Sequence, residues 1–242
     1  MPSTSLYPEQ AIALFARRPA GGRVKTRLIP LLGAQNAALL QAAFLQDSIR
    51  RALSCAPKAA IYLYLTGEAD LSLYSISQLA GNLRLREQPA GNLGERLTEA
   101  FRCLLHKHRR VVITGTDSPQ LLPALLRQAL RELRASDAAL GPCPDGGYYL
   151  IGLRRGLNPA ELKRVFQGVR WSTRFAFRDT LRNLAALNLT CSVLDPVPDV
   201  DRPKDFLELQ RRALQDAKLR RAAPATWRFI RSRLGAPKPA AT

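Results

Sequence analysis

Short apolar runs of strand length alternate with amphipathic segments of helix length along most of this chain. The apolar runs indicate strands at 11–16, 59–65, 83–86, 111–114, 138–141, 148–153 and 189–194. Apolar residues at helical spacing indicate helices over 33–55, over 93–105, from Pro119 to 134, and from a Ser172-Thr173 cap to 187. This alternation predicts an α/β fold with three layers, a mostly parallel sheet between two layers of helices.

The chain has no break in composition that would divide it before about residue 214. Its length of 242 residues allows one large domain. We therefore expect one domain over residues 9–213 and a basic helical extension over 214–242. Pro203 is expected to open the last pair of helices, and the Pro- and Ala-rich sequence from Gly235 predicts a disordered end.

The chain is strongly basic, with 37 Lys and Arg against 19 Asp and Glu and a net charge of +18. Such a charge suits nucleic acid, an anionic membrane surface or a small anionic substrate. Nucleic-acid platforms interleave aromatic residues with basic ones. Aromatic residues make up only 7% of this chain, and its basic end offers just Trp227 and Phe229. The composition therefore favours a small anionic substrate over nucleic acid, with much of the remaining charge on a solvated surface.

The sequence shows no sign of membrane insertion or secretion. No apolar stretch approaches the roughly 18 residues of a membrane helix, and the short run at 11–16 lacks the preceding charge of a signal peptide. The four cysteines are scattered without a C-x-x-C pair, which is typical of reduced thiols in a cytoplasmic protein. His106 and His108 stand among basic residues late in a predicted helix, and we expect both on a solvated turn. The oligomeric state stays open.

A basic loop with two glycines follows the first predicted strand, where ligands of open α/β sheets bind. It runs from Arg17 through Gly21-Gly22 to Lys25 and Arg27. Glycines allow the backbone to approach an anion closely, and Lys25 and Arg27 supply charge for phosphate oxygens. Because the G-x-x-x-x-G-K-[ST] pattern of a P-loop is absent, an ordinary surface loop explains the motif about equally well.

Acidic residues follow two other predicted strands. Asp117 stands at the carboxyl end of the strand 111–114, and Asp199 and Asp201 follow the strand 189–194. Carboxylates in such places can bind Mg²⁺ or Mn²⁺. Helix capping is the competing explanation for Asp117 and Asp201, since aspartate is among the preferred N-cap residues.

The sequence Asp145-Gly146-Gly147 forms a predicted turn, followed at once by Tyr148-Tyr149 and an apolar strand. A hairpin turn accounts for the glycines but gives no reason for the aspartate and the tyrosines. A turn that faces a substrate accounts for all of them.

Six sequence blocks, in this order, resemble the bacterial glycosyltransferase family DUF2064. They are GGRVKTRL (21–28), GNLGERL (91–97), GTDSP (115–119), GPCPDGGYYLIGL (141–153), FQGVRWST (166–173) and DVDRPKDF (199–206). The resemblance implies a GT-A-like fold of the nucleotide-diphospho-sugar transferase superfamily, and some members are named arsenosugar biosynthesis glycosyltransferases. The first loop also resembles, more distantly, that of 2-phospho-L-lactate guanylyltransferase.

The resemblance implies a metal-dependent glycosyltransferase with a nucleotide-diphospho-sugar donor and a small-molecule acceptor. Nucleotide and phosphate would contact Arg17, Gly22, Arg23, Lys25, Arg27, Gly91, Asn92, Gly94 and Arg96. Mg²⁺ or Mn²⁺ would bind Asp117, with Asp199 or Asp201 completing the site. Asp145 would be the general base or would anchor an acceptor hydroxyl, and the acceptor would contact Gly146, Gly147, Tyr148 and Trp171.

The chain departs from the family pattern in two places. Thr116-Asp117-Ser118 leaves one carboxylate where GT-A enzymes often have Asp-x-Asp, and Arg202 replaces a threonine in the last block. Two other functions therefore stay open. One is a nucleotidylyltransferase that transfers NMP from an NTP to a phosphorylated small acid or sugar. The other is a non-catalytic nucleic-acid-binding module that uses the basic tail.

Overall fold

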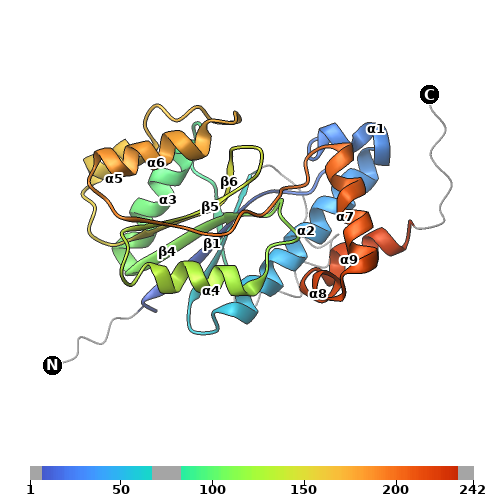
Figure 1. Ribbon diagram of the computed structural model, residues 1–242, viewed down its shortest axis with the longest axis horizontal. Helices are drawn as coiled ribbons and strands as arrows, with labels where there is room; N and C mark the ends of the chain where they lie inside the picture. Colours follow the sequence, from blue (N-terminus) through green and yellow to red (C-terminus); the bar gives the residue numbers. More distant parts are fainter. Residues whose placement is uncertain (1–6, 67–82, 234–242) are drawn as a thin grey trace.

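A seven-stranded sheet in the order β3-β2-β1-β4-β6-β5-β7 forms the centre of the molecule (Figure 1). The structure, a computed structural model, describes residues 7–66 and 83–233. The strands are β1 (Gln10–Arg17), β2 (Ala60–Thr66), β3 (Leu83–Glu87), β4 (Arg110–Gly115), β5 (Ala138–Pro142), β6 (Tyr148–Arg154) and β7 (Cys191–Val193). Strand β6 is antiparallel to β4 and β5, and the other pairs are parallel. The mostly parallel sheet is therefore confirmed.

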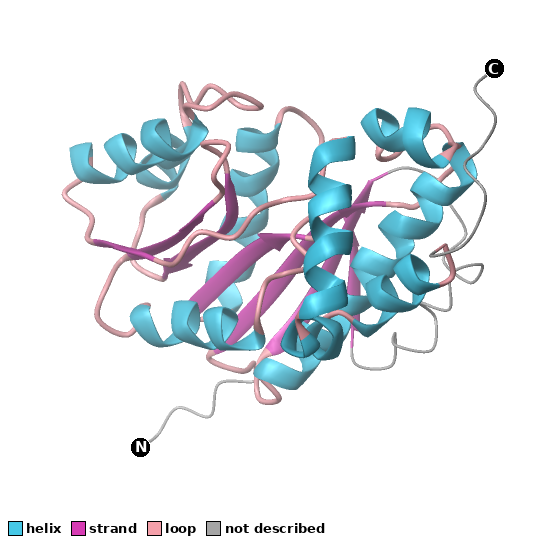
Figure 2. Cartoon of the chain, turned by 45° about the vertical axis from the view of Figure 1, so that its right-hand side comes forward, coloured by secondary structure: helices cyan, strands magenta, loops and turns pink. Residues whose placement is uncertain are grey.

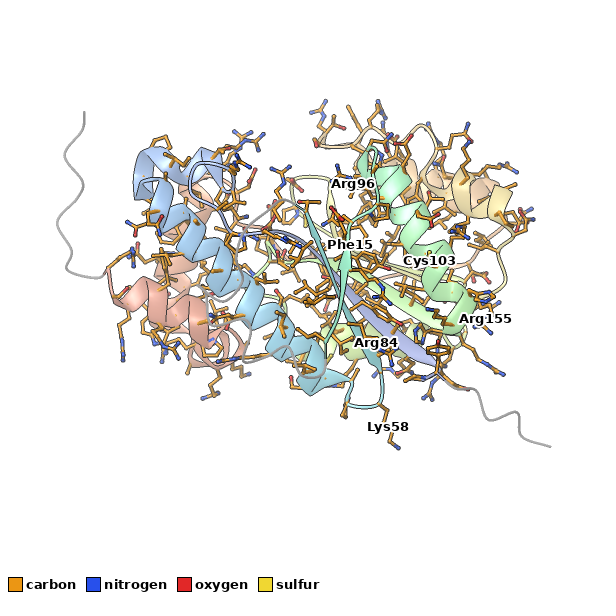
Figure 3. The ribbon with its side chains drawn as sticks, turned by 180° about the vertical axis from the view of Figure 1, so that it is seen from behind. Phe15, Lys58, Arg84, Arg96, Cys103 and Arg155 are labelled. Atoms are coloured by element: carbon orange, nitrogen blue, oxygen red, sulfur yellow. The ribbon has the colours of Figure 1, made fainter. Side chains whose placement is uncertain are left out.

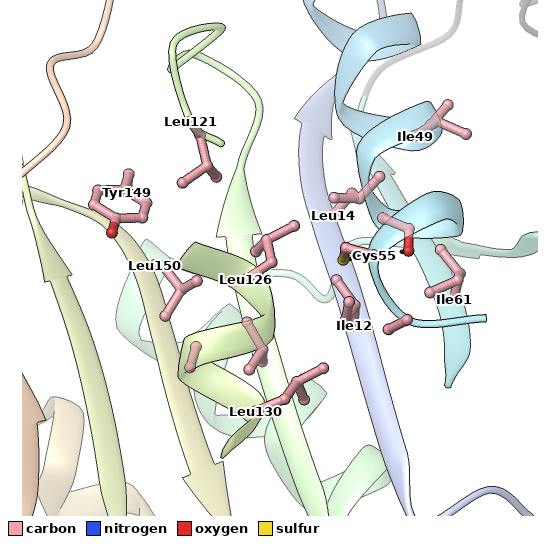
Figure 4. Packing of buried hydrophobic residues seen from close by; sticks show 14 of the residues in the cluster. Ile12, Leu14, Ile49, Cys55, Ile61, Leu121, Leu126, Leu130, Tyr149 and Leu150 are labelled. Atoms are coloured by element: carbon pink, nitrogen blue, oxygen red, sulfur yellow. Dashed lines mark hydrogen bonds between the residues drawn. The ribbon is translucent and has the colours of Figure 1, made fainter. Parts of the chain in front are cut away.

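Helices cover both faces of the sheet because apolar side chains alternate along its strands. Ile12 and Leu14 of β1 pack in one core with α2 (Ala34–Cys55) and α4 (Pro123–Glu132) (Figure 4). Ala11 and Ala13 belong to the opposite core, which holds side chains of α3 (Leu93–Lys107), α5 (Pro159–Phe166) and α6 (Ala176–Ala186). Figure 2 shows the resulting three layers, which confirm the predicted α/β/α architecture.

The C-terminal helices pack on the outer side of α2 in a third core. They are α7 (Pro203–Gln215), α8 (Ala217–Ala222) and α9 (Pro224–Arg231), and they meet the short helices η1 (Thr26–Leu28) and α1 (Ile29–Leu32) as well as α2. Three helices stand where the sequence predicted a pair, because Asp216 caps a new helix and Pro224 begins another. The boundary expected at residue 214 lies inside α7, and the end predicted to be disordered lies outside the described residues.

No single helix in the described part of the chain is long and apolar enough to cross a membrane. Residues 26–32 and helix α2 pass that test only when taken together, across a bend of 118°.

Three local predictions were wrong or incomplete. Helix α4 begins at Pro123, since Pro119 sits in a turn that the Leu121 N–H closes on the Ser118 carbonyl. Helix α6 begins after Phe175, and Thr173 instead accepts a hydrogen bond from the Phe175 N–H. Helix α5 was not predicted, although Asn158 and Glu161 form a capping box around Pro159.

His108 is fully buried, contrary to the expected solvated turn, whereas His106 is exposed as expected. The Nδ1 of His108 lies 2.7 Å from the Pro8 carbonyl oxygen and must be the donor, because a carbonyl oxygen can only accept. Its Nε2 then accepts from the Tyr62 hydroxyl at 2.9 Å, and that hydroxyl accepts from Arg84, labelled in Figure 3, at 3.0 Å. Burial lowers the pKa of His108 below its ordinary value, and the hydrogen bond to Pro8 opposes this only in part.

The neutral state of His108 makes the stability of the fold depend on pH. The unfolded chain takes up the proton near pH 6.5, whereas the folded chain resists it to a lower pH. The contribution of His108 to the free energy of unfolding is therefore complete above about pH 6.5 and falls as the pH is lowered through that value. We expect His108→Asn, whose amide can still donate to Pro8, to be less stable but to lose less stability between about pH 7.5 and 5.5. Urea unfolding at several pH values measures this. An unchanged pH dependence in His108→Asn, or a flattened one in the exposed control His106→Asn, would contradict the prediction.

A buried aspartate of α2 caps the start of α9. Asp47 is fully buried, and its carboxylate accepts hydrogen bonds from the Ala225 N–H, the Thr226 N–H and the Thr226 hydroxyl at 2.7–2.9 Å. Burial raises the pKa of Asp47, and these hydrogen bonds oppose the rise.

The Asp47→Ala variant should lose about 2–3 kcal/mol of unfolding free energy, because it leaves buried donors without an acceptor. The matched control is Asp216→Ala, which removes the exposed cap of α8 and should cost less. Equal losses in urea unfolding would refute the role of burial.

Candidate active site

The predicted site segments lie along one edge of the sheet. The described strands other than β6 share one direction, so the loops after β1, β3, β4, β5 and β7 leave from the same edge. Strand β1 has β2 on one side and β4 on the other, so the strand order reverses there. Ligands of open α/β sheets bind at such a switch point. The loops that follow β1 and β4 carry Lys25 and Asp117.

A buried ammonium group ties three of these loops together. Lys25 Nζ lies 2.8 Å from Asp117 Oδ1, and the two side chains are 3% and 52% exposed. The same ammonium donates to the Val200 carbonyl at 2.8 Å and lies 5.4 Å from the centre of the Phe44 ring. The Val200 N–H in turn donates to the Asp117 carbonyl at 2.9 Å. Lys25 takes up a left-handed backbone conformation (φ 47°), a strained state for a lysine that these partners maintain.

We call the carboxylates of Asp117, Asp145, Asp199 and Asp201 the acidic cluster, because the charge of Asp199 interacts with those of the other three and with the Lys25 ammonium. Burial raises the pKa of Asp199 to about 6, the other three carboxylates add to the rise, and Lys25 opposes it. Asp201 forms a hydrogen-bonded ion pair with Arg27 of the first loop. Like charges this close repel one another, and a bound cation would relieve the repulsion.

The acidic cluster fits a hard divalent cation in its chemistry, because carboxylate oxygens are the ligands that Mg²⁺ and Mn²⁺ prefer. Within residues 7–66 and 83–233, however, no three side chains of His, Cys, Asp or Glu are arranged as a ready metal site. Asp117 is paired with Lys25, and Asp201 is paired with Arg27. The donors are therefore present, but two of them are held by basic residues of the first loop.

Three other basic residues of the first loop are exposed, whereas Arg18 is half-buried. Arg17, Arg23 and Arg27 are exposed, unlike Lys25. Gly22 has a positive φ of 75°, with open space where a side chain would be, so the backbone there is accessible. The loop thus offers three exposed guanidinium groups, of which that of Arg27 is paired with Asp201, while Lys25 serves as an internal ion-pair partner.

The turn between β5 and β6 gives Asp145 a structural role that the sequence did not reveal. Asp145 Oδ1 accepts a hydrogen bond from the Gly147 N–H at 2.9 Å, and Gly147 and Cys143 are bonded across the hairpin. Asp145 is nevertheless exposed. The buried thiol of Cys143 lies near the same acids: burial raises its pKa, and Asp199, Asp145 and Asp117 add to the rise. The turn therefore presents an aspartate to solvent next to the other carboxylates.

Trp171 joins the 91–96 block to the turn before β6. A side chain added at Gly94 would lie 3.0 Å from Trp171 Nε1, and the Trp171 ring packs edge-to-face on Tyr148 with centroids 6.1 Å apart. The Tyr148 hydroxyl is buried, and burial raises its pKa. The structure thus brings together the residues predicted to contact nucleoside and acceptor, with Tyr148 presenting its ring to Trp171.

The 91–96 block forms the start of α3. Asn92 and Glu95 make a capping box, and Arg96 Nε donates to the Gly91 carbonyl at 2.7 Å. Position 91 requires glycine, because the backbone φ there is 98° and a side chain would meet the Glu95 side chain. Figure 3 shows Arg96 at the end of α3 opposite Arg155. Helix capping therefore accounts for Asn92, which remains exposed at the sheet edge that carries the site, while Arg96 is half-buried there.

Two buried polar residues of α2 hold the loop that carries Asp117, and the sequence analysis missed both. Gln41 Nε2 donates to Thr116 Oγ1 at 3.1 Å, and Arg51 Nη2 donates to the Pro119 carbonyl at 3.0 Å. Burial lowers the pKa of Arg51 to about 10. The available signal was the presence of long polar residues on the inner face of an otherwise apolar helix.

Comparisons with known proteins agree with this architecture. A nucleotide-diphospho-sugar transferase from Desulfovibrio desulfuricans G20, so named provisionally, is 32% identical, with a TM-score of 0.79 over 93% of this chain and 95% of that chain. CMP:2-keto-3-deoxy-manno-octonic acid synthetase with CTP shares the fold at 14% identity and a TM-score of 0.53, over 86% of this chain and 99% of that chain. The fold is also shared by 4-diphosphocytidyl-2C-methyl-D-erythritol synthase from Anaerococcus prevotii DSM 20548. Its sequence identity is 12% and its TM-score is 0.54, over 83% of this chain and 96% of that chain.

No curated protein matches the sequence. The family described as "Uncharacterized protein conserved in bacteria (DUF2064)" matches residues 49–173, which is more than half of the chain and spans Asp117, Asp145 and Trp171. With the 32% identity to the Desulfovibrio protein over nearly the whole length of both chains, this match confirms the resemblance that the six sequence blocks carried. The chain belongs to the DUF2064 family and has the fold of the nucleotide-diphospho-sugar transferases.

Proposed function

We propose that the protein is a glycosyltransferase that uses a nucleotide-diphospho-sugar donor, a divalent cation and a small-molecule acceptor. The observation that carries the proposal is the meeting of the basic loop after β1 with the acidic loops after β4 and β7, at the switch point of the sheet. The 32% identity to the Desulfovibrio protein of that name supports the same class of reaction.

The donor diphosphate would lie over the first loop. Arg17, Arg23 and Arg27 are exposed there and offer bidentate hydrogen bonds to phosphate oxygens. The open backbone at Gly22 allows a close approach of the diphosphate. The nucleoside would contact the start of α3, at Gly91–Arg96, which lies at the same edge of the sheet.

Asp117 would hold the divalent cation, with Asp199 or Asp201 as its partner. When bound, the cation neutralises the charge that develops on the leaving nucleoside diphosphate. Lys25 fixes the Asp117 carboxylate from the protein side, through contacts that also fix Val200. This arrangement leaves the exposed side of Asp117 for a ligand.

The acceptor would enter beside the Asp145 turn. Asp145 is exposed next to the acidic cluster and can take a proton from an acceptor hydroxyl. Gly146 and Gly147 lie in the same turn and would contact the acceptor through their half-buried backbone, and Trp171 offers an aromatic surface at the same end of the sheet.

Nucleotide binding and product analysis test this function. Thermal unfolding is measured with UDP-, GDP-, ADP- and dTDP-sugars, with the free nucleoside triphosphates and with single-stranded RNA, each with Mn²⁺ and with EDTA. A nucleotide-sugar that raises Tm in a Mn²⁺-dependent way, followed by release of nucleoside diphosphate, is the expected result.

Two outcomes would overturn the proposal. Pyrophosphate release from a nucleoside triphosphate, in the presence of phosphorylated small acids or sugars, would assign nucleotidyl transfer instead. A response to RNA alone, lost on deletion of residues after Arg220, would assign the nucleic-acid-binding function.

A further inference from the structure

The segment that leads into α6 is attached directly to the Asp145 turn. The Phe177 N–H, in the first turn of α6, donates to the Gly146 carbonyl at 3.0 Å. Gly146 has a φ of 89°, and a side chain there would lie 2.2 Å from the backbone oxygen of Arg174. The backbone of Arg174 therefore packs on the turn that the proposed acceptor approaches.

Three guanidinium groups surround a single aromatic ring in this segment. The guanidinium carbons of Arg170, Arg174 and Arg178 lie 4.0, 5.0 and 4.9 Å from the centre of the Phe175 ring. Each distance is within the range of a cation–π contact. Three positive charges therefore lie around the Phe175 ring, in the segment that packs on the Asp145 turn.

The charge of this cluster is only partly balanced. Asp179 is buried and accepts two hydrogen bonds from the Arg170 guanidinium, each at 2.8 Å, and one from the Arg170 N–H at 3.2 Å, and Arg182 lies 3.7 Å from the same carboxylate. Arg174 and Arg178 are exposed and, among the residues that the structure describes, form no ion pair. Arg174 precedes α6 and Arg178 lies in its first turn, and their like charges, held at the same Phe175 ring, repel each other. An oxyanion between them would remove this repulsion and accept hydrogen bonds from both.

The segment is also held in shape before any ligand arrives. Thr173 Oγ1 donates to the Arg170 carbonyl at 2.7 Å and accepts from the Phe175 N–H at 3.2 Å. Ser172 has a left-handed backbone (φ 60°), and the ion pair of Arg170 with Asp179 closes the loop. Such fixed geometry reduces the entropy that binding would cost.

We propose that Arg174 and Arg178 bind an oxyanion of the acceptor, a phosphate monoester or a carboxylate, and so select anionic acceptors at the Asp145 turn. The inference rests on the proposed function for the identity of the ligand as an acceptor, and on the arginine geometry for the anion site itself. Two guanidinium groups give a planar, bidentate match to either oxyanion.

The test uses the full chain, with inorganic phosphate, glycerol 3-phosphate and lactate as probes. Binding is followed by the NMR shifts of the arginine Nε–H groups and by titration calorimetry. The variants are Arg174→Gln, Arg178→Gln and the double variant. The matched control is Arg182→Gln, one turn further along α6, which removes an exposed arginine beside Asp179.

We expect the double variant to weaken binding of the preferred probe by about 10-fold or more, and the control by less than about 2-fold. The stronger of glycerol 3-phosphate and lactate identifies the oxyanion as phosphate or carboxylate. With an active donor, the double variant should raise KM for the anionic acceptor and leave nucleotide-sugar binding unchanged.

Equal probe affinities in the native protein and the double variant, or equal losses in the double variant and the control, would overturn the anion site. Failure of the proposed function is distinguishable from this result. In that case nucleotide-sugars do not bind, while the arginine variants still weaken phosphate or carboxylate binding, and the anion site stands without its role in acceptor choice. An unchanged KM for an anionic acceptor would overturn that role.

Discussion

The Asp117→Asn variant should lose about 100-fold or more of its transfer activity and its Mn²⁺-dependent nucleotide binding. The substitution keeps the size of the side chain and removes the negative charge that would hold a cation against the donor diphosphate. It also replaces the ion pair of the buried Lys25 ammonium with a neutral contact, while the Val200 carbonyl and the Phe44 ring remain as partners, so a moderate loss of stability should accompany it.

Activity, Mn²⁺ binding and urea unfolding, measured on the same variant, separate these two effects. The matched control is Glu208→Gln, which removes a carboxylate from the exposed ion pair with Arg211 on α7 and should leave activity unchanged. Activity within about 5-fold of the native protein, with Mn²⁺ binding retained, would show that Asp117 does not hold the cation.

The Gly146→Ala variant should lose about 3–5 kcal/mol of unfolding free energy, which is among the largest costs of a single methyl group. Two causes add. The residue has a φ of 89°, which L-residues rarely adopt, and the new Cβ would lie 2.2 Å from the backbone oxygen of Arg174. Because that atom belongs to the backbone, either the β5–β6 turn or the segment before α6 must move. We therefore expect acceptor-dependent activity to be lost along with stability.

Gly168→Ala is the matched control for Gly146→Ala. Gly168 also has a positive φ, 67°, but nothing lies within 4 Å of the added Cβ. Its cost should be limited to backbone strain, about 1 kcal/mol. Urea unfolding of both variants checks the comparison, and similar losses would mean that the contact with Arg174 is not what restricts Gly146.

The order of strands and helices could be predicted because it depends on local patterns. The runs that gave β1, β2 and β4 are apolar at nearly every position, as expected of strands covered on both faces. The first residue of α4 could not be predicted from the sequence, since Pro119 and Pro123 both suit a first helical turn. The hydrogen bond that closes a turn after Ser118 decided between them.

The candidate site was predictable in location but not in its internal pairing. Residues that follow parallel strands must meet at one edge of a sheet, so Lys25, Asp117 and Asp199 could be assigned to one site. No local pattern indicated that Lys25 is buried, because its carbonyl partner, Val200, lies 175 residues further along the chain. His108 was misjudged for the same reason: its partners Pro8 and Tyr62 come from distant segments.

The sequence by itself determined the α/β architecture, the family, and the edge of the sheet where the basic and acidic loops meet. These follow from the periodicity of apolar residues and from motifs read along one segment at a time. Only the tertiary structure decided that Lys25 pairs with Asp117 and that Arg174 packs on Gly146. Ion pairs and close backbone contacts depend on distances of a few ångströms between segments far apart in the sequence, and the packing of the whole chain sets those distances.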